Sequence, residues 1–281
     1  MEKLIQKTGL KRNTIDKFYT NKETVKLCIK KIIKYLKINK NDLIIEPSAG
    51  NGSFIKKIKK ICKNYKFYDL EPEHKDIEKQ DFLELNIDEI KKTNNKIHII
   101  GNPPFGRQSS LAIKFIKKCC EFANTISFIL PKSFKKDSMK KYFIMNYHLV
   151  YEMNIPENSF IVNNRIANVP CIFQIWEYKE IPRKKPKKLL PINFEFVKKI
   201  ENPDISFRRV GVYAGKISTE IQDKSIQSHY FIKFKENINI KELIVSLNKI
   251  KYDFDNTVGP KSISKQELIK EFNKIMNQKN H

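Results

Sequence analysis

Residues 43–53 read LIIEPSAGNGS, and this stretch decides the fold of the chain. A short apolar run at residues 43–45 ends in a turn rich in small residues, and apolar positions then recur at helical spacing over residues 54–61. The order is therefore strand, loop, helix. Gly50 and Gly52 let the backbone approach a ligand closely, and the start of the helix offers unpaired N–H groups.

Strands and helices alternate on both sides of this stretch. An amphipathic helix is expected at residues 21–36, and residues 154–168 are expected to form an exposed loop. Such an alternating series predicts an α/β fold, with a largely parallel sheet covered by helices on both faces. Further strands are expected at residues 65–70, 97–100, 126–130, 148–155 and 169–178, and further helices at 111–122 and 133–146.

The composition changes at residue 182, where the chain reads PRKKPKKLLP. Prolines and crowded like charges disfavour both a helix and a central strand, so we expect a domain boundary there, with a catalytic domain at residues 1–181. Residues 182–281 are expected to form a small α+β substrate-recognition unit. Its predicted strands are residues 194–197, 207–212 and 230–234, and its predicted helices are residues 241–249 and a segment from 265 onward.

The charge of the chain points to a polyanionic partner. The net charge is +24 over 281 residues, which favours nucleic acid through long-range attraction and counterion release. A second explanation stays open, because abundant Lys, Asn, Ile and Phe are also typical of an AT-rich genome. The charge therefore favours a nucleic-acid partner but does not identify the chemistry.

Several other classes of protein are disfavoured. The five cysteines form no CxxC pair and have no histidine cluster nearby, so neither a metal site nor a disulfide framework is expected. No apolar run is long enough for a membrane span, and the first residues lack the apolar core of a secretory signal. We expect a soluble, intracellular protein that has no membrane partner.

The glycine-rich turn has two readings. A dinucleotide-binding GxGxxG fingerprint requires a third small residue where Ile55 stands, so that fingerprint fails. The segment instead fits the pattern acidic-xxx-Gly-x-Gly that begins at Glu46. By itself, a GxG turn is equally compatible with a plain structural turn.

Residues 97–106, IHIIGNPPFG, are the second informative stretch, in which a strand runs into a turn stiffened by two prolines. Consecutive prolines fix the backbone and remove two N–H donors, which leaves carbonyl oxygens as acceptors. An amide side chain, Asn102, precedes the prolines and an aromatic ring, Phe105, follows them. The stretch predicts a rigid set of hydrogen-bond acceptors.

Here the chain resembles a known family. Its NPPF sequence at residues 102–105 resembles the catalytic motif of class I S-adenosylmethionine-dependent methyltransferases that act on amino groups, especially N6-adenine methyltransferases. The motif lies about fifty residues after the acidic-xxx-GxG turn, and the motif order resembles the gamma-type group. The resemblance implies a Rossmann-like fold with a mostly parallel seven-stranded sheet, and S-adenosyl-L-methionine as cofactor.

The resemblance also implies which residues bind the cofactor. Residues 16–20, DKFYT, resemble the motif that covers its methionine end, although Thr20 also fits a helix capping box. Asp69 resembles the ribose-binding carboxylate, with Glu71 as a rival, and Asp81 with Phe82 resembles the pair that contacts adenine. The implied cofactor-binding residues are Phe18, Tyr19, Thr20, Glu46, Pro47, Ser48, Gly50, Gly52, Asp69, Leu70, Asp81, Phe82 and Asn102.

The implied catalytic residues are Asn102, Pro103, Pro104 and Phe105. By resemblance, the Asn102 side-chain oxygen and the Pro103 carbonyl accept hydrogen bonds from an adenine amino group, and Phe105 stacks on the base. Candidate phosphate contacts are Arg107, Lys132, Arg208 and Arg209.

The predicted function is therefore methyl transfer to adenine N6 in nucleic acid, with DNA as the first expected substrate and no metal. Three alternatives stay open: adenine N6 methylation of RNA, methylation of a protein glutamine by a similar Asn-Pro-Pro-aromatic motif, and a catalytically inactive nucleic-acid-binding scaffold.

Overall fold

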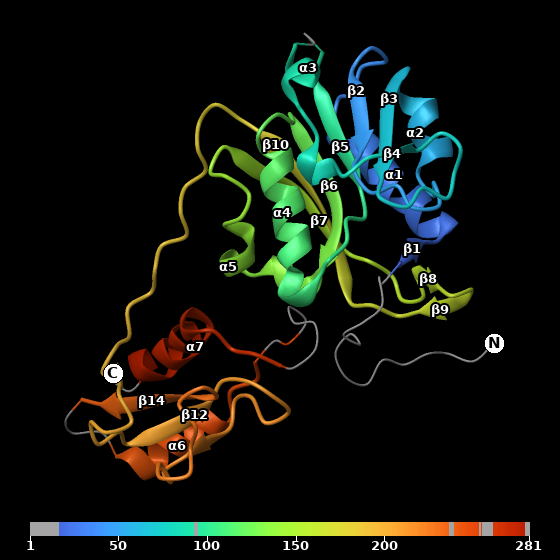
Figure 1. Ribbon diagram of the computed structural model, residues 1–281. Coiled ribbons are helices and arrows are strands. Elements are labelled where there is room, and N and C mark those ends of the chain that lie inside the picture. Colours follow the sequence, from blue (N-terminus) through green and yellow to red (C-terminus); the bar gives the residue numbers. More distant parts are fainter. Residues whose placement is uncertain (1–16, 93–94, 236–238, 253, 255–260, 279–281) are drawn as a thin grey trace. The chain divides into compact units, whose positions relative to one another are not determined.

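The chain divides into two compact units, Met1–Lys184 and Lys185–His281. The computed structural model describes residues 17–92, 95–235, 239–252, 254 and 261–278 (Figure 1). Each unit has its own apolar core, since no residue of the unit 2 core belongs to the two cores of unit 1. The proline- and lysine-rich stretch that begins at residue 182 spans the point of division.

Unit 1 is built on a seven-stranded sheet with the strand order β4-β3-β2-β5-β6-β10-β7. Neighbouring strands from β4 to β6 run parallel, and only β10 runs antiparallel to both of its neighbours. The prediction of a mostly parallel sheet is confirmed. The strands are β2 (Leu43–Glu46), β3 (Asn64–Asp69), β4 (Glu78–Lys79), β5 (Ile97–Gly101), β6 (Thr125–Pro131), β7 (Tyr147–Asn154) and β10 (Cys171–Tyr178).

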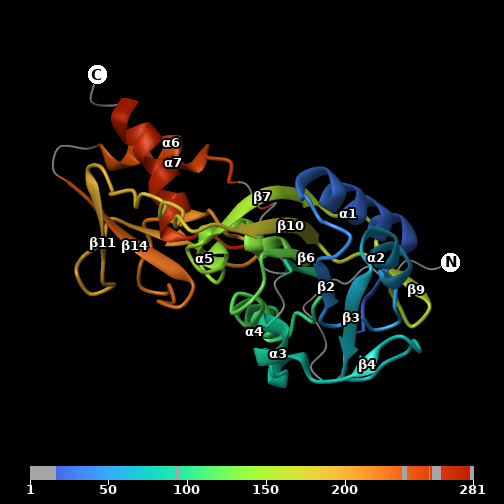
Figure 2. The same ribbon diagram turned by 90° about the horizontal axis from the view of Figure 1, so that it is seen from above.

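Helices cover both faces of this sheet, as Figure 2 shows. On one face, α1 (Lys22–Tyr35) and α2 (Ile55–Ile61) bury their apolar sides in one core. On the other face, α3 (Asp88–Lys91), α4 (Ser110–Cys119) and the 3₁₀ turn η1 (Phe82–Glu84) contribute to a second core. The chain has the Rossmann-like fold of class I methyltransferases.

The order of the strands fixes where a ligand site is expected. The chain begins the sheet at β2, adds β3 and β4 on one side, and then returns to place β5 on the other side. The carboxyl ends of β2 and β5 therefore flank a topological switch point, where ligands bind in open parallel sheets. Both sequence motifs follow these two strand ends.

The segment at residues 154–168 is not the exposed loop that the sequence predicts. It contains a hairpin of β8 (Phe160–Val162) and β9 (Arg165–Ala167), and β8 pairs with β1 (Tyr19–Thr20). Asn163 and Asn164 close the hairpin with φ angles of 47° and 59°, a conformation that Asn tolerates better than most residues. Strands of three residues are too short to show a periodic pattern.

The long helix predicted at residues 133–146 is also wrong. The segment forms the 3₁₀ turn η3 (Lys132–Lys135) and the single-turn helix α5 (Asp137–Lys140), separated by an extended Lys136. Backbone carbonyls of the following turn accept hydrogen bonds from the Arg183 guanidinium, at N–O distances of 2.6–2.9 Å. The Arg183 N–H groups take the place of the backbone N–H donors of a continuing helix. Arg183 lies about forty residues further along the chain.

Unit 2 is a small α+β unit with a four-stranded antiparallel sheet in the order β11-β14-β12-β13. The strand predicted at 207–212 begins and ends earlier, and β13 was not predicted. The strands are β11 (Phe194–Val197), β12 (Ile205–Arg208), β13 (Ile217–Ser218) and β14 (His229–Phe234), and the helices are α6 (Ile240–Asn248) and α7 (Lys265–Gln278).

Candidate active site at the carboxyl ends of β2 and β5

The loops that follow β2 and β5 touch each other. The Ser48 hydroxyl donates a hydrogen bond to the backbone oxygen of Asn102, at 3.3 Å. A Cβ atom added to Gly101 would lie 3.4 Å from Glu46 Cγ and 3.7 Å from Pro47 Cδ. The glycine-rich loop and the NPPF turn therefore meet at the switch point of the sheet.

The amide nitrogen of the Asn102 side chain has hydrogen-bond partners, and its amide oxygen has none among the described residues. Its Nδ2 donates to the backbone oxygen of Phe18 at 3.0 Å and to the Thr20 hydroxyl oxygen at 3.3 Å. Its Oδ1 is buried and has no hydrogen-bond partner in the described part of the chain. A buried acceptor without a partner costs roughly 1–3 kcal/mol, which a ligand that donates a hydrogen bond would recover.

Thr20 reaches Asn102 because it is not the cap of the first helix. The capping-box interpretation of Thr20 is wrong: Asn21 is the N-cap of α1, and its side chain accepts from the Thr24 backbone N–H at 2.8 Å. Thr20 lies one residue earlier, in β1, where it pairs with Phe160 of β8. Its hydroxyl is therefore directed to Asn102 by the hairpin that the sequence did not predict.

The turn after Asn102 is fixed at the start of α4. Pro103 is buried and Pro104 is exposed. Phe105 is partly buried against both cores of unit 1, and its carbonyl accepts from the Leu111 N–H at 3.1 Å. Gly106 has a φ of 68°, and a Cβ there would lie 2.8 Å from Leu111 Cγ, so only glycine fits. The aromatic ring therefore has a fixed attachment beside Asn102.

The N-terminal motif crosses the glycine-rich loop. The Tyr19 ring lies over Gly50, where an added Cβ would be 3.2 Å from Tyr19 Cε1. The Tyr19 hydroxyl donates to Glu73, and Lys17 forms ion pairs with Glu73 at 2.8 Å and Glu71 at 2.9 Å. Burial, and secondly the bond to Glu73, raise the pKa of Tyr19 to about 12. The sequence did not single out Lys17 or Glu73, which hold this crossing in place.

Two carboxyl groups lie beside the same loop. Asp69 accepts from the Gly50 N–H at 2.7 Å and from the Glu71 N–H at 2.9 Å. Glu46 is buried, and its Oε2 has no hydrogen-bond partner among the described residues. Burial, and secondly the charge of Asp69, raise the pKa of Glu46 well above its usual range. Neither carboxyl forms an ion pair with a described residue, which fits a cationic ligand that also carries hydroxyl groups, as S-adenosylmethionine does.

The remaining predicted cofactor residues differ in their exposure. Leu70, after β3, is 61% exposed, whereas Phe82 is 1% exposed and stacks on Phe115 at 5.6 Å between ring centroids. Phe82 therefore belongs to the core of unit 1. Asp81 caps η1, where its side chain accepts from the Leu83 N–H at 2.9 Å. Asp16 lies outside the described residues.

The four predicted phosphate contacts separate into two pairs. Arg107 is exposed directly after the NPPF turn, and Lys132 follows the carboxyl end of β6 at the same edge of the sheet. Arg208 and Arg209 belong to unit 2, where their guanidinium groups donate to the backbone oxygens of Val210 and Gln227, each at 2.8 Å. The first pair lies at the edge of unit 1 that carries Asn102, and the second pair belongs to the other unit.

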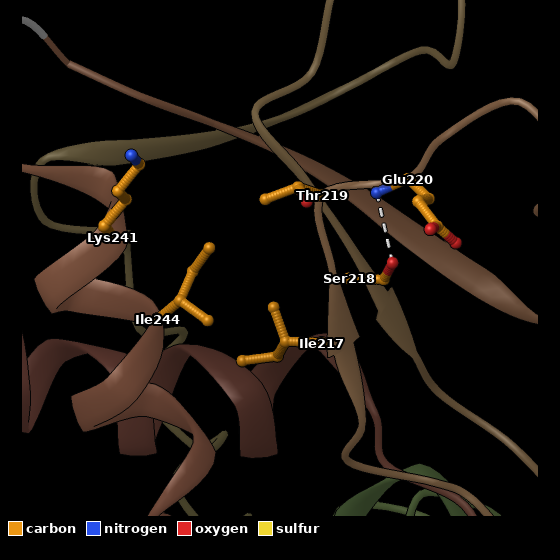
Figure 3. A pocket seen from close by; sticks show the side chains of 6 residues that line it. All are labelled: Ile217, Ser218, Thr219, Glu220, Lys241 and Ile244. Atoms are coloured by element: carbon orange, nitrogen blue, oxygen red, sulfur yellow. Dashed lines mark hydrogen bonds between the residues drawn. The ribbon is translucent and has the colours of Figure 1, made fainter.

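Three further features of the described residues bear on function. Unit 2 contains a pocket of about 430 Å³ between β13 and α6, shown in Figure 3, and no predicted site residue lines it. No group of three or more His, Cys, Asp or Glu side chains within the described ranges could hold a metal ion. None of the helices described is both long enough and apolar enough to span a membrane.

Three known proteins illustrate what the chain is similar to. Protein ENHANCED DOWNY MILDEW 2 of Arabidopsis thaliana is 27% identical over 202 residues, which cover 64% of this chain and 15% of that protein. Ribosomal RNA small subunit methyltransferase A of Francisella tularensis is 25% identical over 208 residues, 64% of this chain and 75% of the relative. The structure of N-methyltransferase NodS from Bradyrhizobium japonicum with S-adenosyl-L-homocysteine matches with 10% identity and a TM-score of 0.41, over 56% of this chain and 87% of NodS.

A family model covers the part of the chain that carries the site. The model of the EDM2 methyltransferase-like domain matches residues 38–180, just over half of the chain. The match includes β2, β5 and the loops that follow them. The fold is that of class I methyltransferases, and the cofactor of this class is S-adenosylmethionine. The chain belongs to the family of EDM2 methyltransferase-like domains.

Proposed function

We propose that the protein transfers a methyl group from S-adenosylmethionine to the N6 amino group of adenine in nucleic acid, with DNA as the first substrate. One observation carries this proposal: the Asn102 Oδ1 atom is a buried acceptor without a partner at the switch point of the sheet. An amino group that donates a hydrogen bond is the kind of ligand that this atom requires.

The chemistry of adenine explains why acceptors are needed. The lone pair of the amino nitrogen is delocalised into the ring, so the nitrogen is a poor nucleophile. Asn102 Oδ1 and the Pro103 carbonyl would accept its two hydrogens, which localises the lone pair and stabilises the positive charge that develops. The anchors of Asn102 Nδ2 on Phe18 and Thr20 support this role, because they keep the amide oxygen directed away from them.

S-adenosylmethionine would supply an electrophilic methyl group next to this acceptor. Asp69 would bind its ribose hydroxyls, and Glu46 would face its cationic part. Gly50 and Gly52 would admit its carboxylate end close to the backbone, under Tyr19. Of the other predicted cofactor residues, Leu70 is exposed next to Asp69 and can cover an adenine ring.

The substrate base would have to leave its stack before it reaches Asn102. Flipping a base out of a duplex costs a few kcal/mol, and stacking on an aromatic ring recovers part of that cost. The partly buried ring of Phe105 would provide the stacking surface, and the exposed Arg107 and the neighbouring Lys132 would contact phosphates. The net charge of +24 supports a nucleic-acid substrate.

RNA is the second candidate substrate. The relative from Francisella is a ribosomal RNA methyltransferase, and the match covers 75% of its length. The same acceptors would serve an adenine in RNA, and a flipped or single-stranded base presents the same edge in both nucleic acids. Unit 2, proposed as the substrate-recognition unit, would then bind RNA.

A methyl-transfer assay tests the proposal. The protein is incubated with labelled S-adenosylmethionine and with matched duplex DNA, single-stranded DNA, RNA and a glutamine-containing release-factor substrate, and the product is identified by mass spectrometry. We expect N6-methyladenine, and a loss of activity of about 100-fold or more in Asn102→Ala. Asn64→Ala, an exposed residue at the amino end of β3, is the matched control and should stay active.

Each other outcome selects an alternative. If only RNA is methylated, RNA and not DNA is the substrate. If glutamine is methylated, the enzyme is a protein methyltransferase and adenine is not its target. Nucleic-acid binding that weakens with salt, without cofactor binding or transfer, identifies an inactive scaffold. Full activity in Asn102→Ala would contradict the proposed mechanism.

A further inference from the structure

The β8–β9 hairpin projects from the same edge of unit 1 that carries Asn102. The segment that contains it leaves the main sheet at the carboxyl end of β7 and returns through Pro170, whose carbonyl accepts from the Lys132 N–H at 3.2 Å, just after β6. On its inner side, β8 pairs with β1, which contains Thr20. Figure 1 shows β8 and β9 beside β1, at one end of the main sheet.

One face of the hairpin is apolar and exposed. Phe160 is buried in a core of unit 1, so its neighbour Ile161, which points to the opposite face, lies toward solvent. Ile161 pairs directly with Ile166 of β9, and the two side chains are 37% and 38% exposed. A cross-strand pair of exposed isoleucines is a small apolar surface that a partner can cover.

The polar residues of the hairpin suit a nucleic acid. Asn163, Asn164 and Arg165 are exposed at its tip, and residues 158–170 contain one Arg and no acidic residue. The structure as described gives the Arg165 guanidinium no hydrogen bond or ion pair. Asn side chains can pair with base edges, and a free guanidinium binds phosphate or guanine. Apolar side chains next to such groups can contact unstacked bases.

We propose that the β8–β9 hairpin is a DNA-binding element that contacts the strand next to the target adenine. Arg165 binds a phosphate, and the Ile161–Ile166 face packs against bases or sugars exposed when the target leaves the stack. The inference rests on the proposed function, because it takes DNA as the substrate. The new element of this inference is that unit 1 itself recognises DNA close to the target base. The hairpin is linked to the site because β8 pairs with Thr20, whose hydroxyl accepts a hydrogen bond from Asn102.

The double variant R165A/I166S tests this proposal in the full chain. Its control, I33S/K37A, also removes one exposed isoleucine and one exposed cation, but from the end of α1 and the residue shortly after it. The affinity for fluorescein-labelled duplex DNA is measured by anisotropy between 50 and 200 mM salt. The hairpin variant should bind about fivefold to tenfold more weakly, and its plot of log K against log salt should be shallower by about 0.9.

Two further readouts separate the possible failures. Cofactor affinity should be unchanged in both variants, which shows that the loss is not one of folding, and kcat/KM for DNA methylation should fall with DNA affinity. If the hairpin variant binds DNA more weakly but the wild type forms no N6-methyladenine, the hairpin is a DNA-binding element and the proposed function is wrong. Equal DNA affinity of the hairpin variant and the control, or a loss confined to RNA, would overturn the hairpin proposal and leave the proposed function intact.

Discussion

At the scale of single residues, Asn102 is held in place by a backbone oxygen and a hydroxyl group from the N-terminal motif. The Thr20 hydroxyl is the one of these two partners that a substitution can remove, since the other is the carbonyl of Phe18. Thr20 is buried, so a substitution of similar size preserves the packing around it.

Thr20→Val should lower kcat about fivefold to tenfold, because the loss of one hydrogen bond of about 1 kcal/mol lets the Asn102 amide reorient. KM for the nucleic acid should change little. Steady-state methylation kinetics check this prediction. Thr24→Val is the control: its hydroxyl bonds to the Ser159 hydroxyl at 2.7 Å, so this variant should lose stability and keep its kcat. Equal kcat values for Thr20→Val and the wild type would show that Asn102 does not depend on Thr20.

Glu46 predicts a pH dependence of stability. Its pKa in the folded protein lies above the usual value of 4.5, so the folded protein binds more protons than the unfolded chain between the two values. The contribution of Glu46 to stability is therefore fully present below the unfolded pKa and falls as the pH rises above it. Glu46→Gln cannot ionise, and it should be more stable than the wild type at pH 8 by about 1–3 kcal/mol, but not at pH 4.

Urea unfolding of both proteins at several pH values between 4 and 8 measures this difference. A difference that does not grow with pH would show that Glu46 ionises in the folded protein as easily as in the unfolded chain. If Glu46 also faces the cationic part of the cofactor, Glu46→Gln should bind S-adenosylmethionine more weakly while being more stable without it.

At the scale of elements, the turn between α5 and β7 depends on one distant side chain. The Arg183 guanidinium donates to the backbone oxygens of Lys140, Phe143, Ile144 and Tyr147, and it lies 5.2 Å from the centroid of the Trp176 ring. Its planar group carries five N–H donors, of which this arrangement uses four, whereas a lysine ammonium carries three.

Arg183→Ala should destabilise unit 1 by about 2–4 kcal/mol, because four carbonyls, three of them in partly buried hydrogen bonds, lose a charged donor together. Arg183→Lys should recover less than half of that loss. The neighbouring exposed residue provides the control, since Lys184→Ala should leave stability unchanged. Urea unfolding followed by the fluorescence of Trp176 reports on this region directly. Similar unfolding midpoints for Arg183→Ala and Lys184→Ala would show that Arg183 does not stabilise this turn.

The elements also show what the sequence could predict. Buried strands such as β5 and β6, and helices such as α1 and α4, carry long apolar patterns, so their types were predicted correctly. The break at residue 136 and the β8–β9 hairpin were not predicted, because both depend on partners far away in the chain. Arg183 stabilises the first, and the pairing of β8 with β1 stabilises the second.

The same distinction applies to the site. The sequence predicts that each motif loop follows a strand, and the strand order brings the two strand ends to one switch point, where Ser48 contacts Asn102. The anchoring of Asn102 by Phe18 and Thr20 was not predicted, since hydrogen bonds across more than eighty residues leave no local pattern. The burial of Phe82 was not predicted, because the sequence of an Asp-Phe pair does not distinguish a core residue from a ligand-binding residue.

At the scale of the whole molecule, the two units have separate cores and are joined by an exposed basic stretch. No helix or strand is described between Tyr178 and Phe194, and residues 184–190 are all exposed. Brief trypsin digestion should therefore cut first at Lys184, Lys187 or Lys188, as fragment masses will show. Because all predicted cofactor residues precede the cut, the N-terminal fragment should bind S-adenosylmethionine within about threefold of the intact chain. First cleavage within a described helix or strand of either unit would contradict this organisation.

The antiparallel strand β10 has a consequence for how the protein is made. β7 is an edge strand whose sole neighbour in the main sheet is β10. In the chain, the β8–β9 hairpin lies between these two strands. While the polypeptide emerges from the ribosome, β7 therefore has no place in the sheet until residue 178 is free. Nascent chains that end before Cys171 must carry an unpaired strand, so the main sheet is completed late in synthesis, and a pause there would expose the chain to aggregation.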